Sequence, residues 1–176
     1  MVEVDRKSEQ DVIDEALVVL NSQHHRLMRQ LSPHAPENLT IEQLRRSQLG
    51  RILARLAAVA RAEIREDKEQ VLGVIDEVLS LLFTPPYGDD YTVPRSFWES
   101  DLGRMLSMAK YRTYDSTELI SIGNAAQQLG VTRPTIYRWM DDRMLGYVRD
   151  EMSGRTFVVR EDVEALRQQG GGAEEQ

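Results

Sequence analysis

Residues 120–140 read ISIGNAAQQLGVTRPTIYRWM, and this stretch decides the fold of the C-terminal third of the chain. The small apolar pair Ala125 and Ala126 predicts the inward face of one short helix that a second helix can approach closely. Gly130 suits the left-handed conformation that closes a helix, and Pro134 is typical of the first turn of the next one. The stretch therefore predicts two short helices joined by a tight turn, which is a helix-turn-helix.

The second of these helices has one apolar side. At the helical repeat, Ile136, Trp139 and Met140 fall on one face. We therefore expect Trp139 to belong to the core rather than to serve as a platform on which a base stacks. The remaining positions of this helix are polar and are left for contacts outside the domain.

The residues that follow predict a β-hairpin and a last short helix. Two runs of β-forming residues, 145–149 and 156–159, flank residues 150–155, which form a turn with a glycine near its end. Residues 161–166 open the last helix. The order helix, turn, helix, hairpin, helix is that of a winged helix-turn-helix.

Together these residues resemble the excisionase-like branch of the MerR-type winged helix-turn-helix superfamily, over roughly 48 of 176 residues. The matching positions are Ala125-Ala126, Leu129-Gly130-Val131, Thr132 to Arg138, the hairpin, and Arg160-Glu161-Asp162-Val163. Members of this family are bacterial, phage or plasmid proteins that bind double-stranded DNA. They include transcription regulators, recombination directionality factors and antitoxin-type repressors.

The resemblance implies that the second helix enters the major groove and that the hairpin wing lies against the DNA backbone or the minor groove. It implies roles for six residues: Thr132 and Thr135 contact phosphate or base edges, Arg133 and Arg138 contact guanine or phosphate, Tyr137 contacts phosphate or a thymine methyl group, and Arg155 contacts the minor groove or phosphate. The chain departs from the family at Asp150 and Glu151, which make this wing less basic than is typical.

Residues 1–114 predict a helical region that serves for oligomerisation. Apolar residues recur at spacings of four and three along a first helix over 11–31, and His24 interrupts this seam; its members are Ile13, Leu17, Leu20, His24, Leu27 and Leu31. A winged domain of about 50 residues makes few DNA contacts alone, whereas dimers read two half-sites. We therefore expect this seam and the amphipathic faces behind it to form a homodimer.

Further helices are expected in the same region over 40–66, over 68–83, and from Ser96 to about Tyr111 or Tyr114. The arginines at positions 51, 55, 61 and 65 of the 40–66 helix predict a solvent-exposed basic face rather than a phosphate-binding site. Glu63 and Glu66 lie close by and reduce the positive electrostatic field of this face. A linker at Pro33 and Pro36 and a disordered glycine-rich tail over 169–176 complete the organisation.

The predicted fold class is mainly α, with a helical region over 1–114 and a winged helix-turn-helix with a small β-hairpin over 119–168.

Composition limits the possible functions. The chain has no cysteine, which excludes disulfides, thiol nucleophiles and cysteine-ligated metals. Its net charge of −7 lies mainly outside residues 119–169, which carry seven basic and seven acidic side chains. Overall acidity argues against sequence-independent coating of nucleic acid. The chain lacks a signal-peptide pattern and an apolar run long enough to cross a membrane, so we expect a cytoplasmic, nucleoid-associated protein with no membrane partner.

These patterns favour a sequence-specific transcription regulator that binds DNA as a dimer. No catalytic motif stands out, so we expect no enzymatic activity and no cofactor. His24, His25 and His34 lack the spacing of metal ligands, so no metal site is expected. Two alternatives stay open. One is an excisionase-like architectural factor that bends DNA, and the other is an antitoxin-type interaction module that binds a protein partner through the N-terminal helices.

Overall fold

A computed structural model describes residues 7–31, 38–85 and 88–171. These residues are mainly helical with one three-stranded antiparallel sheet, which confirms the predicted mainly α class. The chain divides into two compact units, residues 1–109 and residues 110–176. Each unit has its own apolar core. The boundary falls within helix α5 (Asp101–Arg112), a few residues before the 114–119 junction expected from the sequence.

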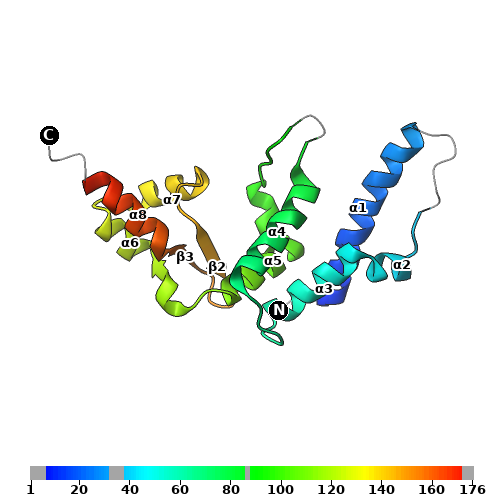
Figure 1. The fold of residues 1–176 in the computed structure, drawn as a ribbon, viewed down its shortest axis with the longest axis horizontal. Coiled ribbons are helices and arrows are strands. Elements are labelled where there is room, and N and C mark those ends of the chain that lie inside the picture. Colours follow the sequence, from blue (N-terminus) through cyan, green and yellow to red (C-terminus); the bar gives the residue numbers. More distant parts are fainter. Residues whose placement is uncertain (1–6, 32–37, 86–87, 172–176) are drawn as a thin grey trace, which may run out of the picture. The chain divides into compact units, whose positions relative to one another are not determined.

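The first unit is built from helices α1 (Glu9–Leu31), α2 (Ile41–Arg46), α3 (Gln48–Ala60), α4 (Lys68–Phe83) and the start of α5, with a short 3-10 helix, η1 (Arg95–Glu99), before α5 (Figure 1). All five α-helices contribute to one core, in which Leu53 and Leu106 are completely buried. The core is aliphatic, as the low aromatic content of the sequence led us to expect.

The helix expected over 40–66 is two helices, so this prediction was wrong in its extent. Thr40 and Gln43 form the predicted capping box at the start of α2. The chain then turns extended at Ser47, whose side-chain oxygen accepts a hydrogen bond from the Gly50 N–H and so begins α3. Gly50 permits this break, because a Cβ there would lie 2.4 Å from the carbonyl oxygen of Leu44. Helix α3 ends at Ala60 rather than at residue 66.

The expected start of the α5 helix at Ser96 was also wrong. Residues Arg95–Glu99 form η1, and α5 begins at Asp101. The side chain of Ser100 accepts a hydrogen bond from the Gly103 N–H at 3.1 Å. A serine four residues later than the expected one therefore caps the helix. Its end at Arg112 agrees with the expected end near Tyr111.

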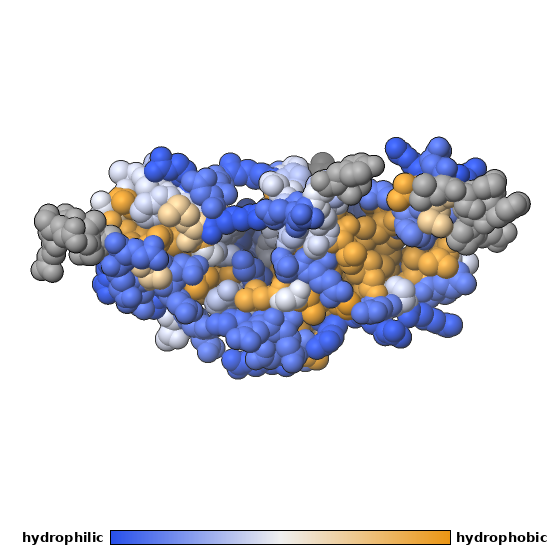
Figure 2. Space-filling model, turned by 45° about the horizontal axis from the view of Figure 1, so that its top comes forward, coloured by the Kyte–Doolittle hydropathy of each residue, from blue (hydrophilic) through white to orange (hydrophobic). Residues whose placement is uncertain are grey.

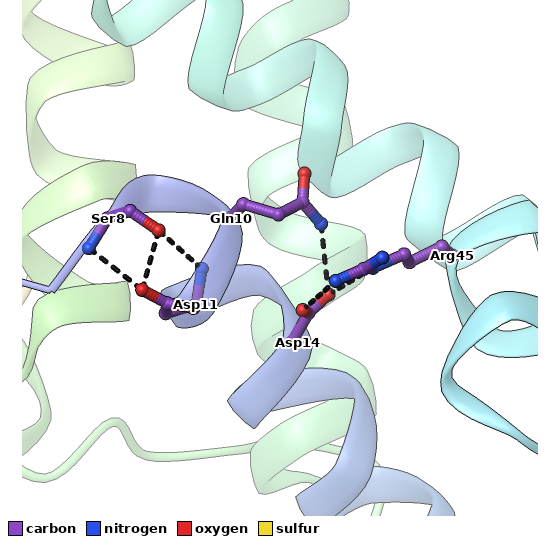
Figure 3. Close-up of polar contacts among 5 residues, drawn as sticks. All are labelled: Ser8, Gln10, Asp11, Asp14 and Arg45. Carbon is purple, nitrogen blue, oxygen red and sulfur yellow. Dashed lines mark hydrogen bonds and ion pairs between the residues drawn. The ribbon is translucent and has the colours of Figure 1, made fainter.

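Polar contacts fix α1 against α2. The Ser8 side chain and the Asp11 carboxylate each accept a hydrogen bond from the other's backbone N–H, which caps the start of α1 (Figure 3). Further along, the Arg45 guanidinium of α2 binds the Asp14 carboxylate with Nε to Oδ1 at 2.9 Å and Nη2 to Oδ2 at 2.5 Å. This two-bond contact lowers the pKa of Asp14 below its ordinary value.

The sequence led us to expect that the α1 seam binds a second copy of the chain. The structure leaves only part of this seam free to do so. Ile13 and Leu17 are buried in the core of their own unit. The same stripe continues to His24, which is exposed, and to Leu27, which is 58% exposed. Only the C-terminal half of the stripe therefore remains uncovered. Leu31 ends the seam, and its side chain lies outside the described part, as do Pro33, His34 and Pro36.

The second unit contains a short 3-10 helix, η2 (Ser116–Glu118), strand β1 (Leu119–Ser121), helices α6 (Ile122–Gln128) and α7 (Arg133–Asp141), strands β2 (Tyr147–Asp150) and β3 (Arg155–Val159), and helix α8 (Arg160–Gly171) (Figure 1). The strand order is β1-β3-β2, with both pairs antiparallel. Strands β2 and β3 are the predicted hairpin. Strand β1, which the sequence did not reveal, pairs Ile120 with Val158.

The core of the second unit lies where the helices meet the sheet. Ile136 of α7, Val158 of β3 and Val163 of α8 are completely buried there, beside Ala125 of α6. The expected close approach of α6 and α7 at the alanine pair agrees with this packing. Helix α8 extends to Gly171, so the tail expected to be disordered from residue 169 is helical at its start, and residues 172–176 lie outside the described part.

Candidate nucleic-acid interface

Local signals in the sequence fix the turn between α6 and α7. Ser121 accepts a hydrogen bond from the Asn124 N–H and begins α6. Gly130 adopts φ +65°, the left-handed conformation predicted for the residue that closes this helix. Thr132 stands at the N-cap of α7, but its side chain bonds the Thr135 hydroxyl at 3.0 Å rather than a backbone N–H. Two of the predicted contact residues are thus hydrogen-bonded to each other.

Helix α7 buries one side and leaves the other to solvent. Ile136 and Met140 are buried, and Trp139 is half-buried against the same core. The prediction that Trp139 belongs to the core is confirmed. Tyr137 and Arg138 are exposed, which places them on the side of α7 that faces away from the core.

Arg133 is exposed as well, but its side chain leans towards α6. A Cβ atom built on Gly123 would lie 3.1 Å from Nη2 of Arg133 and 3.7 Å from its Cζ. The guanidinium group therefore rests beside the backbone of the first turn of α6. Sequence reasoning did not find this contact, because nothing in the local pattern relates residue 123 to residue 133.

The turn of the β2–β3 hairpin uses its own acidic groups. The Asp150 carboxylate accepts hydrogen bonds from the Met152 N–H at 3.0 Å and from the Ser153 hydroxyl at 2.5 Å. These bonds lower the pKa of Asp150, the Ser153 bond most of all. Glu151 lies 3.4 Å from Arg149 as an ion pair. The wing's carboxylates are thus engaged locally, while Arg155 at the start of β3 is exposed.

The three arginines predicted to contact DNA share one property. Across the described ranges, no hydrogen bond or ion pair engages the guanidinium groups of Arg133, Arg138 or Arg155. The same holds for Arg167 in α8, which the sequence did not single out. Other arginines of this unit do have partners: Arg149 pairs with Glu151, and Arg160 donates to the Thr117 carbonyl. Each of the three predicted arginines therefore has N–H donors free for an anionic ligand.

Sequence reasoning missed a lysine that contacts a side chain of strand β2. The Lys110 ammonium group is 5.6 Å from the centre of the Tyr147 ring, a cation–π contact. Burial lowers the pKa of Lys110, and the nearby Asp162 carboxylate partly offsets this. Asp162 also accepts a hydrogen bond from the Gly146 N–H at 2.7 Å. The Asp162 carboxylate thus joins α8 to the residue before β2. Lys110 is partly buried and is not one of the exposed cations of this unit.

Two arginines of the basic arc predicted at positions 51, 55, 61 and 65 are held in ion pairs. Arg55 pairs with Glu66, and Arg61 pairs with Glu9 and Glu63. The expected dilution of this basic arc by Glu63 and Glu66 is confirmed. Within residues 7–31, 38–85 and 88–171, no three histidine, aspartate or glutamate side chains gather as metal ligands.

Among the helices described, none has both the length and the apolar character needed to cross a membrane. Comparisons with protein-family models, with curated proteins and with solved structures gave no match. Function is therefore inferred from the residues of the site.

Proposed function

We propose that residues 119–168 form a winged helix-turn-helix domain and that the protein is a sequence-specific, DNA-binding transcription regulator. The order β1, α6, α7, β2, β3, α8 and the strand order β1-β3-β2 support this proposal. In such a domain α7 enters the major groove and the β2–β3 turn lies against the backbone or the minor groove. The protein acts by binding and has no catalytic role, and its DNA target places it on the nucleoid.

The observation that carries the proposal is the division of α7 into two sides. Ile136 and Met140 anchor the helix in the core, and the opposite side presents Tyr137 and Arg138, with the guanidinium group of Arg138 unpartnered. An arginine in this position can donate two hydrogen bonds to guanine O6 and N7. Thr132 and Thr135 lie at the start of the same helix, where side-chain hydroxyls contact phosphates or base edges.

Dimerisation through the first unit completes the proposal. Figure 2 shows hydrophobic residues, in orange, at the surface of the molecule. In the first unit, Val18, Val19 and Leu27 of α1 are exposed. The exposed C-terminal half of the α1 stripe is the part that a second copy covers. A dimer places two copies of α7 on half-sites that are about one helical turn apart.

The test is selection of duplexes from a random DNA pool by the purified protein, followed by affinity measurement on the selected site. We expect a palindromic or directly repeated sequence, and we expect Arg133→Ala combined with Arg138→Ala to weaken specific binding by ~2–6 kcal/mol. The matched control replaces Arg51 and Arg104, two exposed arginines of the first unit, with alanine. Equal affinity of the wild type and the Arg133/Arg138 double variant would overturn the proposal.

Two other outcomes identify the alternative functions. Strong bending of the DNA with cooperative binding to arrays of sites would indicate an architectural factor. Failure to select any DNA, with a protein partner retained by the Arg133/Arg138 double variant, would indicate an interaction module that uses the N-terminal helices.

A further inference from the structure

Arg133 and Arg138 occupy different sides of α7. If Ile136 marks the direction of the core, the helical repeat places Arg138 about 160° away from it and Arg133 only about 60° away. Arg138 is thus near the middle of the outward side, and Arg133 is on the flank. Although both side chains are exposed, they do not point the same way from the helix.

A glycine on α6 makes room for the flanking arginine. The position of a Cβ on Gly123 would be 3.1 Å from Nη2, 3.6 Å from Nε and 3.7 Å from Cζ of Arg133. Three guanidinium atoms therefore lie where a longer side chain at residue 123 would project. No described residue hydrogen-bonds this guanidinium group, so it lies in the space beside Gly123 with its N–H donors unoccupied.

We propose that Arg133 is a contact to the DNA phosphate backbone positioned by Gly123, and that sequence reading falls to Arg138. This division rests on the proposed function. When a helix lies in the major groove, the middle of its outward side faces the base edges, and its flanks face the phosphates that border the groove. An arginine that leans from α7 across the first turn of α6 is directed to that border. Gly123 is a positioning residue, since it acts only through Arg133.

The test compares Arg133→Ala, Arg138→Ala, Gly123→Leu and the double variant Arg133→Ala/Gly123→Leu on selected DNA over a range of salt concentrations. Gly73→Leu is the matched control, because a Cβ at this exposed position of α4 meets no atom within 4 Å. Leucine favours helix more than glycine does, so neither glycine variant is expected to lose helix stability. Gly123→Ala serves as a milder version, and thermal unfolding reports whether each variant is folded.

We expect Arg133→Ala to weaken binding about tenfold for each protomer, by the same factor on every related sequence. The slope of log affinity against log salt becomes shallower by about 0.9 for each protomer, because one phosphate contact is lost. Gly123→Leu moves affinity and slope in the same direction, and adding it to Arg133→Ala has no further effect. Arg138→Ala changes which sequence is selected, and Gly73→Leu changes nothing.

Three outcomes would overturn the inference while the proposed function stands: Arg133→Ala changes the selected sequence, the salt slope stays the same, or the Gly123→Leu loss adds to that of Arg133→Ala. A wild-type protein that binds no duplex would overturn the proposed function and this inference together. Binding by the wild type thus separates the two failures.

Discussion

Replacing Ile136 with alanine should remove much of the second unit's free energy of unfolding and leave the stability of the first unit unchanged. Ile136 is 0% exposed, and its side chain packs against α6, the sheet and α8. Loss of a buried isoleucine to alanine costs about 2–5 kcal/mol, and loss of one methylene in Ile136→Val costs about 1 kcal/mol. A unit the size of residues 110–176 has a stability of roughly 3–10 kcal/mol. The alanine variant is therefore expected to be near the limit of folding.

The chain contains one tryptophan in each unit, which makes the effect separable. Trp139 packs against the core of the second unit, and Trp98 packs against that of the first. Urea unfolding is followed by fluorescence in a Trp98→Phe background to report the second unit and in a Trp139→Phe background to report the first. We expect Ile136→Ala to lower the midpoint seen by Trp139 and to leave the midpoint seen by Trp98 unchanged.

The matched control is Leu53→Ala, since Leu53 is equally buried in the first unit. It should lower the midpoint seen by Trp98 alone. A change of less than about 1 kcal/mol for Ile136→Ala would refute the packing argument for α7. Equal shifts of both midpoints by either variant would refute the division of the core into two units.

Three further predictions concern local features. Gly50→Ala should destabilise the first unit, because the added Cβ would lie 2.4 Å from a carbonyl oxygen, whereas Gly73→Ala should not; thermal unfolding compares the two, and equal melting temperatures would be evidence against the α2–α3 junction. Leu27→Glu should convert the proposed dimer to a monomer in sedimentation, and Leu81→Glu, which changes an equally exposed leucine of α4, should not; a dimer that survives Leu27→Glu would place the interface elsewhere. Asp150 has a lowered pKa in the folded protein, so its stabilising effect is full above the unfolded value of 3.8 and is lost as the pH falls through the lower folded value. Asp150→Asn should therefore lower stability at neutral pH and make no difference in strong acid, and a pH-independent difference would contradict this.

Short-range signals in the sequence predicted most of the second unit. Gly130 at positive φ, Pro134 in the first turn of α7 and the apolar face at Ile136 each act within a few residues. The hairpin likewise follows from β-forming runs beside a turn. Such features are readable because the physical cause and the structure it produces lie close together in the chain.

Features that depend on distant residues could not be read in this way. Strand β1 is only three residues long and exists because it pairs with β3, far along the chain. The contact of Arg133 with Gly123 depends on how α6 and α7 pack. The α3 start was missed because Ser47 and Gly50 sit within an otherwise continuous helical pattern.

The α1 seam shows a different limit. Apolar periodicity identifies which side of a helix is buried, but not what buries it. Ile13 and Leu17 are covered by their own unit, and Leu27 on the same stripe is exposed. The N-terminal half of the α1 stripe thus packs within its own unit, and the C-terminal half is left exposed for another contact.

The most direct test of the central claim is an NMR titration of the full chain with its selected duplex, followed through backbone amide and arginine side-chain signals. If α7 enters the groove, the largest changes appear at residues 132–138 and at Arg155, and the ion-paired arginines Arg55 and Arg61 do not shift. Changes confined to the first unit, or no changes at saturating DNA, would contradict the account.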